Sequence, residues 1–155
     1  MVQHIGPVSA TIRDGAAELT YELIGASAGL GVVLMHGGQS GRSQSRVFAL
    51  ALAEACSAAG CPVRVLIMDR RNMGTSAVAF GGAESLPQEE AEDVHALMSA
   101  LQLGRCILAG SSSGARTCLL LAHCHPADVA ALILAPPTGG GATSPTSIPH
   151  LCASY

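Results

Sequence analysis

The stretch RCILAGSSSGARTCLLLAHC, residues 105–124, decides the fold. An apolar run of strand length leads into Gly110-Ser111-Ser112-Ser113-Gly114, and an apolar run with helical spacing follows. A sharp strand-to-helix turn of the form G-x-S-x-G strains its central residue and lifts that side chain clear of the sheet. Only Ser112 occupies the central position, and Gly110 and Gly114 are small enough for the two backbones to approach closely. The turn also places the N–H of Ser113 at a helix N-terminus, where it can stabilise a developing oxyanion.

The rest of the chain alternates between strand and helix in the same way. Apolar runs typical of strands buried on both faces occur at 31–35, 63–68, 105–109 and 129–135, and helical spacing occurs at 43–59, 89–101 and 115–124. Earlier in the chain, residues 10–12 and 17–24 flank Asp14-Gly15 and predict an antiparallel hairpin. This order predicts an α/β fold with a mostly parallel sheet, helices on both faces and an N-terminal hairpin.

The domain organisation follows from a change in composition near residue 138. Residues 1–138 hold all the predicted strands and helices and are expected to form one domain. Residues 139–155 are rich in Gly, Ser, Thr and Pro without periodicity, which predicts an irregular tail.

Composition excludes several classes of protein. The 155 residues are 49% hydrophobic and 12% charged, with a net charge of −3 and no basic run, so neither nucleic acid nor an anionic membrane is an expected partner. No apolar run reaches the roughly 18 residues of a membrane span, and the first residues lack the pattern of a signal peptide, so we expect a cytoplasmic protein. The six cysteines have irregular spacing and no C-x-x-C, which predicts buried thiols and neither a metal nor a cofactor.

Three motifs follow successive predicted parallel strands. His36-Gly37-Gly38 comes after the first, DRRNMGTS at 69–76 after the second, and the G-x-S-x-G turn after the third. With these motifs the chain resembles the α/β-hydrolase superfamily over residues 10–137. The resemblance implies that Ser112 is a nucleophile and that the backbone N–H groups of Gly38 and Ser113 form an oxyanion hole. In the 69–76 loop Asn72 replaces a glycine of the family pattern, but Asn tolerates positive φ, so we expect the loop geometry to be kept.

Other polar residues are given supporting or solvent-exposed roles. The resemblance implies that His36 orients its loop through hydrogen bonds, and we interpret Asp69 and Arg71 as a pair that holds the second loop. His123 and His125 suggest metal ligands, but a favourable charge at a helix C-terminus is the preferred interpretation. The acidic residues at the start of the second helix are expected to form a solvated first turn; they are Glu89, Glu90, Glu92 and Asp93.

A serine nucleophile requires a histidine and an acid, and the sequence offers neither in a suitable place. After Ser112 the only acid is Asp128, which precedes the fourth strand at the opposite end of the sheet, and His150 lies in the irregular tail. By resemblance, the chain stops before the family's acid, its histidine and any lid. Residues 129–134 would then form an exposed sheet edge of interior composition, which predicts self-association.

Three functions follow from these observations. The first is hydrolysis of an ester or similar carbonyl in a small-molecule substrate through an acyl-enzyme on Ser112, catalytically incomplete in this chain. The second is non-catalytic ligand binding or regulation on the same fold, which the lack of a triad acid and histidine favours. The third, a dinucleotide-binding domain, is disfavoured because the first βα turn reads HGGQSGRS, not G-x-G-x-x-G, and no suitable acid lies about 20 residues further on.

Overall fold

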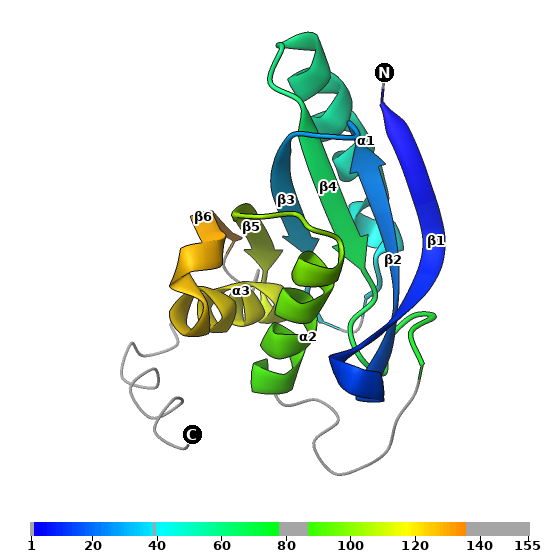
Figure 1. The fold of residues 1–155 in the computed structure, drawn as a ribbon, viewed down its shortest axis with the longest axis vertical. Helices are drawn as coiled ribbons and strands as arrows, with labels where there is room; N and C mark the ends of the chain where they lie inside the picture. The colour runs from blue at the N-terminus through cyan, green and yellow to red at the C-terminus, as the bar shows by residue number, and fades with distance from the viewer. Residues whose placement is uncertain (1, 39, 78–86, 136–155) are drawn as a thin grey trace.

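The computed structural model describes residues 2–38, 40–77 and 87–135. In these ranges the chain forms one six-stranded sheet and three α-helices (Figure 1). The strands are β1 (Gln3–Ile12), β2 (Ala17–Gly25), β3 (Leu30–Met35), β4 (Val63–Met68), β5 (Cys106–Ser111) and β6 (Val129–Ala135). The helices are α1 (Ser43–Ala58), α2 (Pro87–Ala100) and α3 (Ser113–Cys124). Every predicted strand and helix is present.

The strands are ordered β1-β2-β4-β3-β5-β6. β1 pairs with β2 and β2 with β4 in antiparallel fashion, whereas β4, β3, β5 and β6 are parallel. The predicted fold class, a mostly parallel sheet with an N-terminal hairpin, is confirmed. Because the parallel strands end at one edge, the register places Met35 beside Gly110 and Ser111 beside Ala135. The loops that follow β3 and β5 therefore meet there.

β1 is longer than the sequence predicted. It begins at Gln3, and the register between β1 and β2 shifts between Ile5 and Val8, around Gly6-Pro7. An edge strand tolerates such a proline because the missing N–H is not needed by a second neighbour. The Gly-Pro pair hid this part of the strand from the hydrophobic pattern.

Each face of the sheet has its own hydrophobic core. α1 covers one face, while α2 and α3 lie together on the other (Figure 1). In β4, Val65 and Ile67 pack into the core that contains Ala49 and Ala53 of α1. The alternate residues of β4 pack against α2 and α3 with Val94, Leu97 and Leu121, among others. This alternation is why the parallel strands read as continuous apolar runs. None of the described helices is both long enough and apolar enough to span a bilayer.

A buried carboxylate lies between the sheet and α1. Glu22 of β2 is fully buried, accepts hydrogen bonds from Arg42 and Arg46, and contacts Nε2 of His4 at 2.7 Å. Burial alone would raise the pKa of Glu22, but the hydrogen bonds from Arg46, His4 and Arg42 lower it to about 2. This ion cluster fixes the N-terminal end of α1 to the hairpin.

The five described cysteines differ in burial, and Cys56 is partly buried against the core on the α1 face. Cys106 and Cys118 are buried as expected, and burial raises the pKa of these thiols to about 11 and about 12. Cys61 and Cys124 are exposed, so the expectation of buried thiols is wrong for them; each lies in or next to a turn that ends a helix. Cys152 lies outside the described residues, as does the predicted tail.

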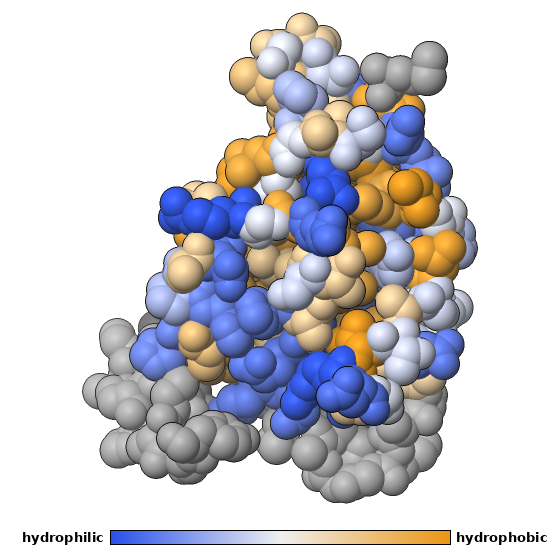
Figure 2. All heavy atoms as spheres, in the orientation of Figure 1, coloured by the Kyte–Doolittle hydropathy of each residue, from blue (hydrophilic) through white to orange (hydrophobic). Residues whose placement is uncertain are grey.

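The two sheet edges expose apolar side chains. Hydrophobic residues gather over β1 in Figure 2, where Ile5 and Val8 are exposed. At the other edge, every residue of β6 after Val129 is exposed, and Ile133 is 61% exposed. The predicted exposed edge strand of interior composition is therefore present among the described residues.

We predict that Glu22→Gln destabilises the protein by about 3 kcal/mol at pH 7, because two arginines lose a buried carboxylate partner. Since the folded-state pKa of Glu22 is lowered from 4.5 to about 2, its contribution is complete above pH 4.5 and is lost as the pH falls toward 2. Urea unfolding of both proteins between pH 7 and pH 2 measures this. A stability difference that stays constant across that range would contradict the assignment.

We also predict that the chain self-associates through β6. Ile133→Lys should shift the protein toward the monomer in size-exclusion chromatography with light scattering, because an edge lysine opposes strand pairing. Val47→Lys, at an exposed apolar position on α1, is the matched control and should leave association unchanged. A wild-type protein that is monomeric at high micromolar concentration would refute this prediction.

Candidate active site

The turn between β5 and α3 strains Ser112. This residue has φ 52° and ψ −120°, is exposed, and directly precedes the first residue of α3. A non-glycine residue in this region stores on the order of 1–3 kcal/mol, and its side chain points away from the sheet. The N–H of Ser112 donates to the carbonyl of Ala135 at the end of β6, which holds the turn from the neighbouring strand.

Two glycines make this turn sterically feasible. A Cβ on Gly110 would lie 2.6 Å from the carbonyl oxygen of Gly114, and a Cβ on Gly114 would lie 2.5 Å from the carbonyl oxygen of Met35. Both are backbone clashes without a flexible side chain to move. The close approach predicted for the two glycines is therefore present, and α3 packs against β3 as well as β5.

The loop after β3 lies against this turn. A Cβ on Gly37 would lie 3.0 Å from the Cβ of Ser112, and Gly38 has a positive φ of 53°. The N–H of Gly38 donates to Oγ of Ser113 at 2.9 Å. As the first residue of α3, Ser113 has an N–H without an intrahelical acceptor. The structure thus places both predicted oxyanion donors beside the serines, with the Gly38 amide bonded to the Ser113 hydroxyl.

An open, mostly apolar pocket of about 290 Å³ lies beside the turn. Its lining combines the ends of β3 and β5 with residues from α1 and β6, including His36, Phe48, Ser111 and Ile133. The pocket is large enough for a small apolar group, and Gly110 and Ser111 of the turn line it, whereas Ser112 does not.

His36 is part of this wall. It is 2% exposed, its Nδ1 lies 3.4 Å from the carbonyl oxygen of Gly37, and among the described residues its Nε2 has no hydrogen-bond partner. Burial and the positive charge of Arg70 lower the pKa of His36, so the ring is neutral at pH 7. This 3.4 Å contact with the neighbouring residue is the one side-chain hydrogen bond of His36 among the described residues.

Asp69 organises the second loop. Its carboxylate accepts from the N–H of Thr75 at 2.9 Å and from the N–H of Arg42 at 2.7 Å, and the Arg42 side chain pairs with it. Burial would raise the pKa of Asp69, but these N–H groups and the Arg42 charge lower it. A Cβ on Gly74 would lie 2.3 Å from this carboxylate, which explains the glycine. Asn72 adopts φ 60°, as its substitution for glycine predicted.

Asp69 and Arg71 do not form the pair that the sequence suggested. Asp69 continues the alternation of β4 toward α1, whereas Arg71 turns to α2 and forms two hydrogen bonds with Asp93, at 2.8 and 2.7 Å. Arg13 of the hairpin turn also donates to Asp93, at 3.0 Å. The two members of the expected pair therefore serve opposite faces of the sheet.

The acidic residues of α2 are also not the solvated turn that we expected. Glu90 is 5% and Asp93 1% exposed. They share the buried face of α2 with Val94 and Leu97, at helical spacings of three, four and seven residues. That spacing, together with the adjacent Arg70 and Arg71, was the sequence signal from which the burial of Glu90 and Asp93 could have been predicted. Glu89 and Glu92 remain partly exposed.

A buried network missed by the sequence analysis connects this helix to the site. Arg70 donates to both carboxylate oxygens of Glu90, at 3.2 and 3.0 Å, and to the carbonyl of Gly38. Thr117 of α3 donates to Glu90 at 3.0 Å. These bonds fix the Gly38 peptide relative to α3, so Arg70, Glu90 and Thr117 are positioning residues for the loop after β3.

His95, His123 and His125 lie away from Ser112, and His150 lies outside the described residues. His125 ends α3 and Asp128 precedes β6, so both lie at the amino edge of the parallel strands, as predicted for Asp128. His125 contacts a carboxylate oxygen of Glu92 and stacks on His95, which the helix-charge interpretation did not foresee. His123 is exposed on the last turn of α3.

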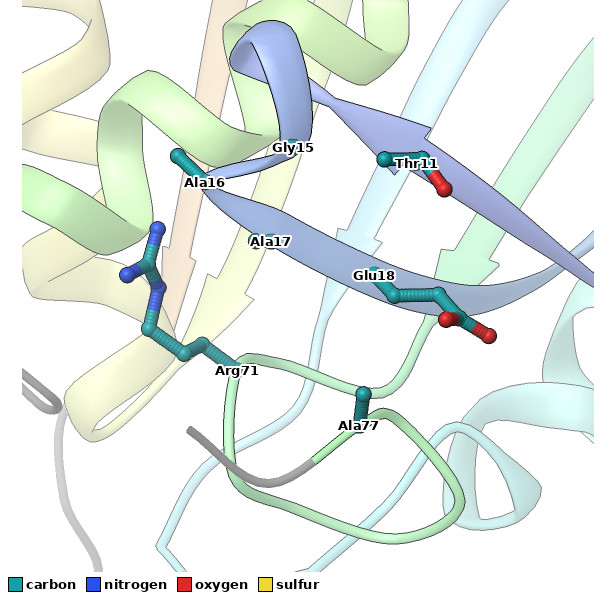
Figure 3. A pocket seen from close by; sticks show the side chains of 7 residues that line it. All are labelled: Thr11, Gly15, Ala16, Ala17, Glu18, Arg71 and Ala77. Carbon is teal, nitrogen blue, oxygen red and sulfur yellow. The ribbon is translucent and has the colours of Figure 1, made fainter. Parts of the chain in front are cut away.

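A second pocket, of about 240 Å³, lies between the hairpin turn and the loop after β4 (Figure 3). Arg71 and Glu18 are its charged lining residues, and Ser112 is not among them. Arg71 is held by Asp93, and no lining residue belongs to the turn between β5 and α3, the elbow, so this pocket is separate from it.

The sheet topology and the strained serine between two glycines define the class of α/β hydrolases. Residues 32–153 match the model of the alpha/beta hydrolase family, and the chain belongs to this family. Among curated proteins, none matches the chain.

Solved structures give the same fold. A thermophilic esterase from Thermogutta terrifontis, solved with malate bound, is 26% identical over 90% of this chain and 48% of its own, with a TM-score of 0.72. A hydrolase from Pseudomonas aeruginosa is 28% identical over 82% of this chain and 44% of its own, with a TM-score of 0.71. An epoxide hydrolase from Vigna radiata is 20% identical over 86% of this chain and 39% of its own, with a TM-score of 0.72. At this identity, the similarity shows the fold alone. The chain spans less than half the length of each of these proteins.

We predict that Gly110→Ala destabilises the protein by about 3 kcal/mol, because the new methyl group clashes with the backbone of α3. Gly60→Ala is the matched control: Gly60 has a positive φ but no atom within 4 Å of an added Cβ, so about 1 kcal/mol is expected. Urea unfolding of both variants measures the difference. Equal losses would show that the close approach at the elbow is absent.

Proposed function

We propose that this chain carries the nucleophile and the oxyanion-binding half of a serine hydrolase that acts on an ester or similar carbonyl. The observation that carries the proposal is the strained, exposed Ser112 beside the amides of Gly38 and Ser113. Strain at a polar side chain that faces solvent serves no packing purpose, and a serine held in this way is suited to nucleophilic attack.

The reaction is an acyl transfer in two steps. Oγ of Ser112 attacks the carbonyl carbon, the carbon–oxygen double bond opens to an oxyanion, and the hydroxyl proton passes to a histidine base. The oxyanion accepts hydrogen bonds from the N–H groups of Gly38 and Ser113, which requires the Ser113 hydroxyl to release Gly38. Collapse expels the alcohol with the proton from the base and leaves an acyl-Ser112, which water then hydrolyses by the same steps.

The base and its acid belong outside the described residues in this proposal. Among the described residues Ser112 Oγ has no hydrogen-bond partner, and His36 is buried against the carbonyl of Gly37. The 155-residue chain alone is therefore expected to be a weak catalyst. The alternative, a non-catalytic protein that binds a ligand in the pocket beside His36 and Phe48, is favoured by the same lack of a base.

The three adjacent serines provide the test. We predict that a fluorophosphonate probe labels the full-length protein, that Ser112→Ala abolishes labelling, and that Ser111→Ala and Ser113→Ala are still labelled at Ser112. The 155-residue chain should label on the order of 10⁴-fold more slowly, because none of its described residues serves as the base. Mass spectrometry of the labelled peptide identifies the serine.

Labelling that survives Ser112→Ala would overturn the assignment of the nucleophile. A complete protein that never labels, but binds an ester analogue at the pocket without turnover, would instead support the ligand-binding function.

A further inference from the structure

A cluster of histidines and carboxylates lies at the amino edge of the sheet, away from Ser112. We define the α2–α3 cluster as Glu92 and His95 of α2, His125 at the end of α3, and Asp128 of the 3₁₀ turn Pro126–Asp128. The rings of His95 and His125 stack with centroids 3.6 Å apart and planes 9° apart. The reaction proposed for Ser112 uses none of these residues.

The polar atoms of this cluster converge. Nε2 of His125 lies 2.9 Å from Oε1 of Glu92, and Nε2 of His95 lies 2.9 Å from Oδ2 of Asp128. One ligand atom from each of Glu92, His95 and His125 lies within 4.8 Å of the other two. Around a tetrahedral zinc ion with bonds of about 2.0–2.1 Å, ligand atoms are about 3.4 Å apart. Side-chain rotations that bring the three ligand atoms somewhat closer together would therefore let them bind one ion.

The supporting structure suits such a site. Asp128 accepts from Nε2 of His95, which leaves Nδ1 of that ring for an ion and orients the ring, as carboxylates behind metal-binding histidines do. The backbones that carry the ligands are fixed, because α2 and α3 are joined by the buried bond between Thr117 and Glu90. The ligand side chains are only partly buried, so they are free to rotate.

A pocket gives access to the cluster. It has a volume of about 200 Å³ and is lined by His95 and Asp128 together with Met98, Ser99, Gln102 and Gly104. It opens the His95 and Asp128 side of the cluster to solvent, while Glu92 and His125 are not among its lining residues.

We propose that Glu92, His95 and His125 bind a divalent transition-metal ion of the zinc class, with Asp128 as the carboxylate that orients His95. Two imidazoles and one carboxylate are donors that zinc accepts readily, whereas magnesium and calcium prefer all-oxygen sites. To place both ring nitrogens on one ion, the stacked rings must fan apart. The ion then links α2 to the end of α3 and stabilises the folded state by mass action, because the unfolded chain lacks the assembled site.

Isothermal titration of chelator-treated protein with zinc chloride, and thermal unfolding with and without zinc, test this proposal. We expect one zinc per chain, a higher Tm with zinc, and no effect of magnesium. His95→Gln and His125→Gln should each weaken zinc binding on the order of tenfold or more, since even loss of an orienting partner costs that much. Circular dichroism without zinc establishes that each variant is folded, and Glu92→Gln provides a third ligand variant.

Two neighbours of the cluster supply matched controls. His123→Gln removes an exposed histidine from the same helical turn, and Cys124→Ser removes the exposed thiol next to His125. Both variants should bind zinc as wild type does, and the cobalt(II) complex should lack a thiolate charge-transfer band. Binding that is unchanged in His95→Gln and His125→Gln, binding lost in Cys124→Ser, or no effect of zinc on Tm would each overturn the proposal.

Discussion

The close approach of β5 and α3 is the constraint on which the rest of the site depends. With no side chain at Gly110 or Gly114, the two backbones come within contact distance, and Ser112 between them is left with a strained conformation that faces outward. The same contact brings α3 against the carbonyls at the end of β3. Gly38 and Ser113, whose amides we propose as oxyanion donors, are 75 residues apart in the chain and are therefore brought together by one steric condition at the carboxyl edge of a parallel sheet.

Buried charges hold the loops around this edge. Lysine is absent from the chain, and all eight basic residues are arginines. An arginine presents a planar fork of several donors, and Arg71 binds both oxygens of Asp93 with two of its nitrogens. Arg70 instead contacts both oxygens of Glu90 through Nη1 and the carbonyl of Gly38 through Nη2. On the other face, Arg42 joins Glu22 to Asp69. Each face of the sheet thus has its own ion network, which anchors the loop after β4 to a helix on that face.

The elements and the elbow could be predicted from sequence because they depend on local patterns. Apolar runs, a turn residue and paired glycines act within a few positions of one another, and Asn72 revealed its positive φ by its residue type. Ion partners could not be predicted in this way. Arg71 and Asp93 are joined only because the turn after β4 directs Arg71 to α2, on the face opposite the one that Asp69 serves. The contact between the N–H of Gly38 and the hydroxyl of Ser113 likewise depends on the folded structure. The burial of Glu90 could have been predicted from its helical spacing, but its pairing with Arg70 could not.

The backbone angle of Ser112 is the most direct test of this account. A residue with φ near 52° has its amide and α protons unusually close, so NMR should show a strong intraresidue NOE between them at Ser112. Ser111 and Ser113, which are not among the positive-φ residues, are internal controls with weak NOEs. An NOE at Ser112 as weak as those of its two neighbours would mean that the serine is unstrained, and it would contradict the elbow from which the oxyanion site and the proposed reaction are derived.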